Sequence, residues 1–123
     1  MTHVIAETRD ADWIATKALT RLGEVSVDNP PSPEDLQLAL DQLDATYVDL
    51  QTRGVCYIPD LDATPAAYAT WLAERVAIDL KGDYGYQAPD GQAGLKPLSM
   101  VEGALRRLSA DTPSYGPQQV EFS

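Results

Sequence analysis

This 123-residue sequence is poor in the residues that build disulfide and zinc sites, and it has no long apolar run. Cys56 is the only cysteine and His3 the only histidine. An intrachain disulfide is therefore excluded, and we expect no zinc site made from cysteine and histidine. No apolar stretch approaches the ~20 residues that a membrane-spanning helix needs, so we expect no transmembrane segment and no contact with a membrane.

Basic residues are scarce in the middle of the chain. The formal net charge is -10, and between Arg21 and Arg75 a single base, Arg53, stands among ten acids. A protein that grips nucleic acid needs clustered lysine and arginine to neutralise phosphates. This composition opposes nucleic-acid binding. The acidity has a second reading, in which it serves only to keep the protein soluble.

Catalytic patterns are also missing. With one histidine, a nucleophile paired with a histidine base is not expected, and Cys56 lies in an apolar run typical of a buried side chain rather than a reactive thiol. Asp60 and Asp62 have the spacing that opens a calcium loop. The sixth position of that loop is Pro65 instead of glycine, and the twelfth is Trp71 instead of glutamate. We predict that the protein is not an enzyme and holds no cofactor or metal.

Helix signals divide most of the chain into four segments. The first is predicted to begin after Asp10 or Asp12 and to run to Leu22. The second begins at a Ser32 cap and keeps one apolar stripe as far as Gly54. Two more segments follow, and together the four predict an all-α fold, a small helical bundle occupying residues 1–111.

The second half of the chain carries the other two helices and a short apolar run. Residues 55–58 are β-prone and predict one brief strand. Thr64 is placed to cap the third helix, which runs to about Lys81 and is apolar enough to cross the core centre. The fourth helix is predicted from near Pro97 to Asp111.

The last twelve residues, 112–123, differ from the body. Pro113 prevents the fourth helix from continuing, and the segment has one charge together with Tyr115, Val120 and Phe122. It is either a frayed terminus or an extended C-terminal tail that docks onto a partner through these three side chains.

Arg106 and Arg107 form a candidate interface before that tail. They are either a clamp for a phosphate or a partner carboxylate, or two bases that complement the dipole at the end of a helix.

The order of these segments resembles the head-to-tail adaptor (head-completion, or connector) proteins of tailed bacteriophages and gene transfer agents. The resemblance is carried by KALTRLGEVSVDNPPSPEDLQLALDQLDATYVDLQTRG, by TPAAYATWLAERVAIDLKGDYG, and by ALRRL with the terminal YGPQQVEFS. Together these segments cover nearly the whole chain from Asp10 onward.

The resemblance implies a structural protein of the virion, assembled in the bacterial host cytoplasm. About twelve copies would form a ring under the portal protein, extend the DNA channel and present a platform to a tail or stopper protein. DNA would pass without specific binding. The resemblance also implies that the C-terminal segment, here around Tyr115, Val120 and Phe122, reaches the portal or a neighbouring subunit.

A small cellular protein-interaction module, such as an antitoxin-like or adaptor subunit, is the main alternative. It would share the acidic surface and the tail, but it would form a dimer or a small complex instead of a ring.

Overall fold

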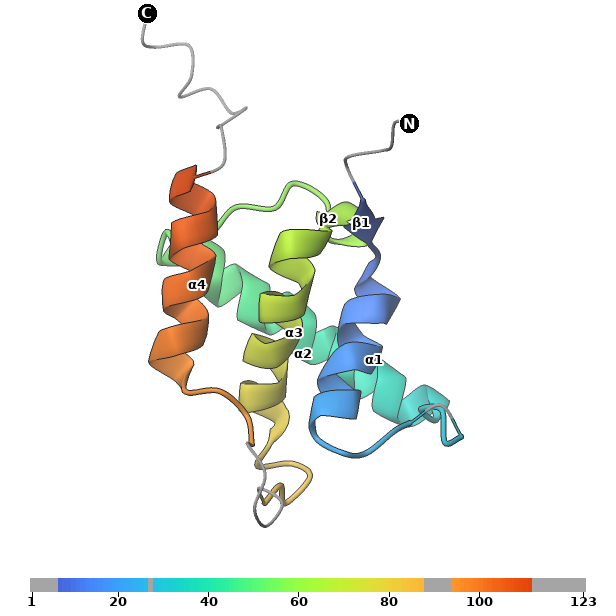
Figure 1. The fold of residues 1–123 in the computed structure, drawn as a ribbon. Helices are drawn as coiled ribbons and strands as arrows, with labels where there is room; N and C mark the ends of the chain where they lie inside the picture. Colours follow the sequence, from blue (N-terminus) through green and yellow to red (C-terminus); the bar gives the residue numbers. More distant parts are fainter. Residues whose placement is uncertain (1–6, 27, 88–93, 112–123) are drawn as a thin grey trace, which may run out of the picture.

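The computed structural model describes residues 7–26, 28–87 and 94–111, and these form a helical bundle (Figure 1). The helices and strands are β1 Thr8–Arg9, α1 Ala11–Arg21, α2 Pro33–Thr52, the 3-10 helix η1 Leu61–Ala63, β2 Thr64–Pro65, α3 Ala66–Leu80 and α4 Leu98–Asp111. The predicted all-α bundle of four helices is confirmed. The tail, 112–123, lies outside the described residues.

The ends of α1 and α2 follow from their local sequence. Asp10 caps α1, its carboxylate accepting a hydrogen bond from the Trp13 backbone N–H at 2.8 Å. Ser32 caps α2 through the Asp35 N–H at 3.1 Å. Gly54 lies just beyond the end of α2 with φ +73°, a left-handed conformation that glycine adopts without strain. Both predicted helices are therefore confirmed, with Asp10 as the first cap.

The start of α3 differs from the prediction. Thr64 does not cap the helix: its hydroxyl donates to the Leu61 carbonyl at 3.0 Å, and Pro65 stands at the cap position without a side-chain hydrogen bond. The Ala66 N–H instead donates to the Glu7 carbonyl at 3.0 Å. The small antiparallel β1–β2 pair brings this backbone acceptor from the start of the described chain, so a main-chain carbonyl takes up one of the free N–H groups at the start of α3.

The predicted brief strand at 55–58 is also wrong. Val55, Cys56 and Ile58 are buried, but this segment pairs with no strand among the described residues. The buried Tyr47 hydroxyl accepts a hydrogen bond from the Ile58 N–H at 2.6 Å and donates to the Ile58 carbonyl at 3.0 Å. One side chain thus satisfies both backbone groups that a partner strand would otherwise pair.

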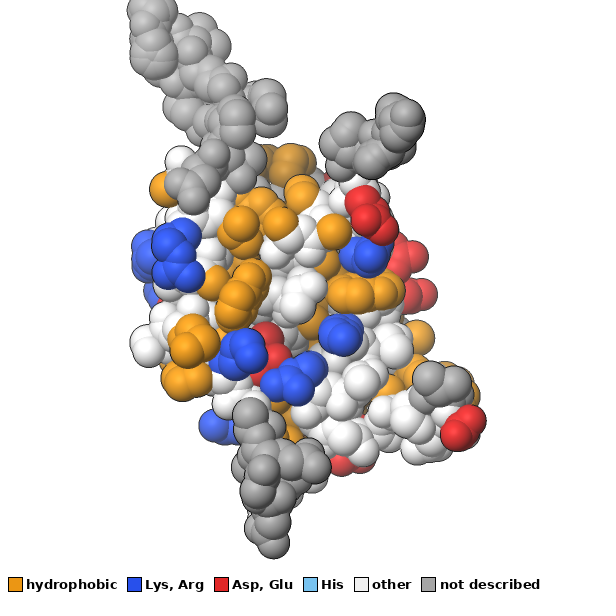
Figure 2. Space-filling view, in the orientation of Figure 1, with side chains coloured by type: hydrophobic (Ala, Val, Ile, Leu, Met, Phe, Trp, Pro, Cys, Tyr) orange, Lys and Arg blue, Asp and Glu red, His pale blue; other side chains and the backbone are white. Residues whose placement is uncertain are grey.

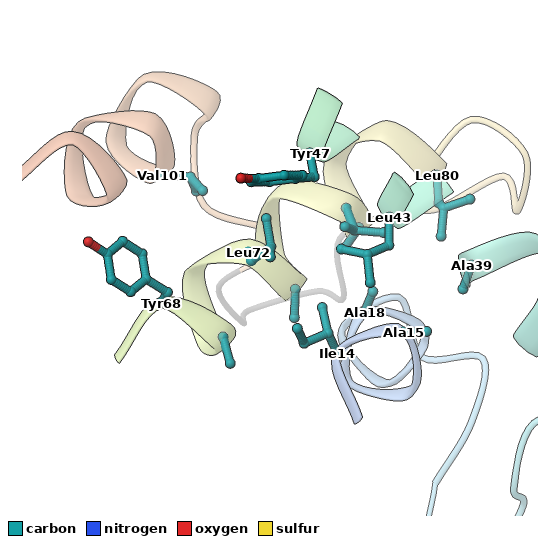
Figure 3. Packing of buried hydrophobic residues seen from close by; sticks show 14 of the residues in the cluster. Ile14, Ala15, Ala18, Ala39, Leu43, Tyr47, Tyr68, Leu72, Leu80 and Val101 are labelled. Carbon is teal, nitrogen blue, oxygen red and sulfur yellow. The ribbon is translucent and has the colours of Figure 1, made fainter. Parts of the chain in front are cut away.

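Helix α3 is the centre of the bundle, as its apolar sequence predicts. It packs against each of the other three helices, with α1 and α4 on either side and α2 crossing behind (Figure 1). Figure 3 shows side chains from all four helices pointing into one shared core. Within the described parts of the chain, no helix combines the length and apolarity needed to cross a membrane.

Candidate functional site

The structure describes two of the five predicted docking residues. Tyr115, Val120 and Phe122 lie outside the described residues. Arg106 and Arg107 are exposed on α4 and form no ion pair with another described residue.

The structure places this arginine pair within α4. Because α4 continues to Asp111, Arg106 and Arg107 lie one turn before its last turn, where the dipole acts more weakly. Consecutive residues on a helix point about 100° apart, so the two side chains leave α4 in different directions.

A cluster of charged side chains fixes α4 to the C-terminal end of α2 and the middle of α3. Glu102 of α4 accepts two hydrogen bonds from Arg53, at 2.6 and 2.9 Å, in a bidentate arrangement. The Arg75 Nε donates to the same carboxylate at 2.9 Å. Arg75 also binds Asp79, which lies four residues further along α3. Arg53 also binds Asp49, which lies four residues earlier in α2. We call these five residues the Glu102 cluster.

The charges of the Glu102 cluster are shielded from water to different degrees. The Arg75 side chain is 8% exposed and that of Glu102 is 14% exposed. The hydrogen bonds from Arg53 lower the pKa of Glu102 from 4.5 to about 2; partial burial opposes this shift, and the bonds from Arg75 add to it. Glu102 is consequently a fixed anion at neutral pH.

The cluster continues into the contact between α2 and α3. Asp79 accepts a hydrogen bond from the buried Thr46 hydroxyl at 2.6 Å, and Gln42 donates to the same hydroxyl at 3.1 Å. Among the described residues, every buried side-chain nitrogen or oxygen atom has a hydrogen-bond partner. The buried polar groups therefore fasten helices to one another.

A second charged contact joins α1, α3 and the segment before α4. The Glu74 carboxylate binds Arg21 of α1 at 2.6 Å and accepts a hydrogen bond from the Lys96 backbone N–H at 2.7 Å. Arg21 also donates to the Gly94 carbonyl at 3.2 Å. Burial on its own would raise the pKa of Glu74, but the hydrogen bonds from Arg21 and Lys96 outweigh it, and the pKa is lowered.

The outer side of α2 carries free acids and exposed apolar groups. Its buried residues pack on the rest of the bundle, so the exposed ones face away from α1 and α3. Apart from Asp49, which belongs to the Glu102 cluster, the charged ones among them form no ion pair with other described residues. We call this surface the acidic face; it consists of Glu34, Leu38, Asp41, Asp44, Ala45 and Val48.

The opposite side of the bundle is basic. Figure 2 shows lysine and arginine side chains spread over α1, α3 and α4, with apolar side chains between them and most of the visible acids near the margins. Five bases on these helices or next to them, Lys17, Lys81, Lys96, Arg106 and Arg107, form no ion pair with another described residue. From their exposure and helical spacing we assign Lys17, Thr70, Trp71, Lys81, Lys96, Met100 and Arg107 to this surface, and we call it the basic face.

The residues considered for chemistry are either buried or hydrogen-bonded to the backbone. Cys56 is buried as predicted, and burial raises the pKa of its thiol to about 11. Asp60 and Asp62 accept hydrogen bonds from the backbone N–H groups of Asp62 and Ala11, at 3.0 and 3.1 Å. Within the described ranges, histidine, cysteine, aspartate and glutamate form no group of three or more that could hold a metal ion.

Sequence reasoning missed the two charged contacts. Their one visible signal is the pair Glu74 and Arg75, adjacent charges in the middle of the most apolar helix. Charged residues are rarely buried without partners, so this pair could have predicted an ionic contact inside the bundle, but not its partners Arg21 and Glu102.

No protein-family model matches the chain, and neither a curated protein nor a solved structure matches it.

Proposed function

We propose that this protein is a head-to-tail adaptor that forms a ring under the portal of a tailed phage or gene transfer agent. In this role the helical body is the repeating wedge of the ring, and the C-terminal segment docks onto the portal or the neighbouring subunit. The ring extends the DNA channel and offers a platform to a tail or stopper protein. The site of action is the head–tail connector of the virion.

The observation that carries the proposal is the way α4 is held. A docking segment transmits force to the body only if the helix before it has a fixed position. Two arginines from different parts of the chain, Arg53 and Arg75, bind one carboxylate on α4, at Glu102. The start of α4 is tied separately, through Glu74 and the Lys96 N–H. The chain thus enters residue 112 from a helix anchored at both its beginning and its middle.

The charge of the body supports the same proposal. A net charge of -10 gives DNA phosphates little reason to bind, so DNA slides through the channel instead of adhering to it. The order of four helices, with a long acidic second helix and an apolar third one, is the order on which the resemblance to adaptors rests.

The deciding experiment is electron microscopy of the protein mixed with its candidate portal protein. We expect a ring of added density beneath the portal. A free dimer without affinity for the portal would contradict the proposal and favour the cellular interaction module.

A truncation tests the role of the tail. Removing residues 112–123 is expected to leave the helical circular dichroism signal unchanged and to abolish portal binding. A triple substitution, Tyr115→Ala with Val120→Ala and Phe122→Ala, should have the same effect. The matched control replaces Gln118 and Gln119 with alanine and should bind as the intact protein does. Normal binding of the triple variant would show that these side chains are not the docking residues.

A further inference from the structure

Unpaired charges of opposite sign gather on two sides of the bundle. Bases buried between helices, such as Arg75, are paired with acids of the same chain. Lys17, Lys81, Lys96 and Arg107, which form no ion pair in the described chain, lie on the basic face, whereas Asp41 and Asp44 lie on the acidic face. The acidic face is the outer side of α2, which runs behind α1 and α3 as seen in Figure 1, and the basic face is the side in front.

Both faces also expose apolar side chains among their charges. On the acidic face Val48 is 59% exposed and Leu38 is 41% exposed. On the basic face Met100 is 50% exposed, and Trp71 is half-buried. Apolar groups surrounded by charges of one sign are what a partner of opposite charge can cover.

We propose that the acidic face of one copy docks onto the basic face of the next copy of this chain. Charge complementarity selects this pairing, because a two-fold dimer through either face would place like charges together. Contact through opposite sides of the bundle is heterologous and therefore extends from copy to copy. Closure of such a row into a ring rests on the proposed adaptor function.

The overall negative charge opposes self-association only at long range. At about 0.15 M salt the Debye length is roughly 8 Å, so repulsion between whole molecules is largely screened. Charge pairs in direct contact across the interface are screened much less. Moderate salt thus favours the contact, and very high salt weakens the charge pairs themselves.

Disulfide trapping between differently labelled chains tests which faces meet. One chain carries Ala45→Cys in the acidic face, and the other carries Thr70→Cys in the basic face; both positions are exposed, and the native Cys56 is buried. After mild oxidation of an equal mixture, we expect mixed pairs to exceed the two kinds of like pair combined by several-fold. A random distribution of pairs would overturn the proposal.

The matched control moves one cysteine away from both faces. Ala63→Cys is exposed in η1, and its mixture with the Ala45→Cys chain should give a random distribution of pairs. Equal trapping of Ala63→Cys and Thr70→Cys by Ala45→Cys would show that the encounter is unspecific and would also overturn the proposal.

Charge reversal in the same assay tests the cause of the pairing. Adding Asp41→Lys and Asp44→Lys to the Ala45→Cys chain should abolish the excess of mixed pairs. Adding Lys17→Glu and Arg107→Glu to the Thr70→Cys chain should then restore it. Circular dichroism confirms that each variant is folded. Persistence of the excess in the singly reversed mixture, or its failure to return in the doubly reversed one, would overturn the proposal.

The assay needs no portal protein, so the two proposals fail separately. Random trapping together with a ring beneath the portal would reject this contact and keep the adaptor function. Specific trapping without portal binding would keep the contact and reject the adaptor.

Discussion

Helices α2 and α3 are the two longest helices in the described structure, and they use their charges in different ways. Helix α2 is amphipathic: one side packs on the bundle, and the other carries acids without ionic partners in the described chain. Helix α3 is covered by the other three helices, and its charged residues Glu74 and Arg75 are buried with partners from α1 and α4. The charges of α3 hold the body together, whereas Asp41 and Asp44 of α2 form no ion pair in the described chain and remain available to another molecule.

The largest difference between the two helices should appear when a side chain is shortened. Leu72 of α3 is fully buried, and Leu72→Ala is expected to lower the free energy of unfolding by about 3 kcal/mol, since it leaves a cavity in the core. Val48→Ala on the outer side of α2 should change it by less than about 0.5 kcal/mol. Urea denaturation measures both. A similar loss in the two variants would mean that α2 packs on something in the isolated protein.

Neutralising an ion-paired acid should cost much more stability than neutralising an unpaired one. Glu102→Gln leaves the buried Arg75 with one ionic partner fewer, and we expect a loss of roughly 2 kcal/mol at neutral pH. The matched change on the acidic face, Asp44→Asn, removes an exposed acid in the middle of α2 without an ionic partner in the described chain and should leave stability unchanged. Thermal unfolding of both variants makes the comparison.

The stability lost in Glu102→Gln should depend on pH, and the pKa of Glu102 gives the sign of that dependence. The folded-state pKa of Glu102 lies near 2, below the unfolded value of 4.5. Its contribution is therefore complete above pH 4.5 and is lost as the pH falls toward about 2. In that window the Glu102→Gln variant should show a shallower loss of stability with falling pH than the intact protein. Parallel curves for the two proteins would contradict the proposed role of this carboxylate.

A smaller effect is expected from removing one hydroxyl. Tyr47→Phe deletes both hydrogen bonds to Ile58 in a buried site, and should cost about 1–2 kcal/mol. Tyr57, which is 63% exposed, supplies the control, and Tyr57→Phe should leave the unfolding midpoint unchanged. If Tyr47→Phe is also silent, water replaces the hydroxyl at Ile58.

The smallest effects concern the glycines that follow the two helices. Gly54 after α2 has φ +73°, so Gly54→Ala should destabilise by about 1 kcal/mol. Gly82 after α3 lies outside the left-handed region and has open space around it. Gly82→Ala should therefore stabilise slightly, by about 0.5 kcal/mol, through a lower entropy of the unfolded chain. Differential scanning calorimetry gives the sign of each change, and equal signs would contradict the backbone argument.

The sequence predicts the helical body well because its signals are local. A cap, an apolar stripe and a terminal glycine lie within one segment, as Ser32 and Gly54 do for α2, and such signals need no distant partner. The predicted cap at Thr64 and the predicted strand at 55–58 are wrong for the opposite reason. The Glu7 carbonyl and the Tyr47 hydroxyl, which decide these places, come from other parts of the chain.

Sequence alone determined the fold class, the order of the helices, the burial of Cys56 and the strong net negative charge. The docking roles of Tyr115, Val120 and Phe122 stay predictions, since these residues lie outside the described structure. Tertiary structure decided which charges are paired. Arg21 and Glu74 are 53 residues apart, and Arg75 and Glu102 are 27 apart. Composition counts such charges without indicating their partners, because only the packing of α1 and α4 on α3 brings them within hydrogen-bonding distance.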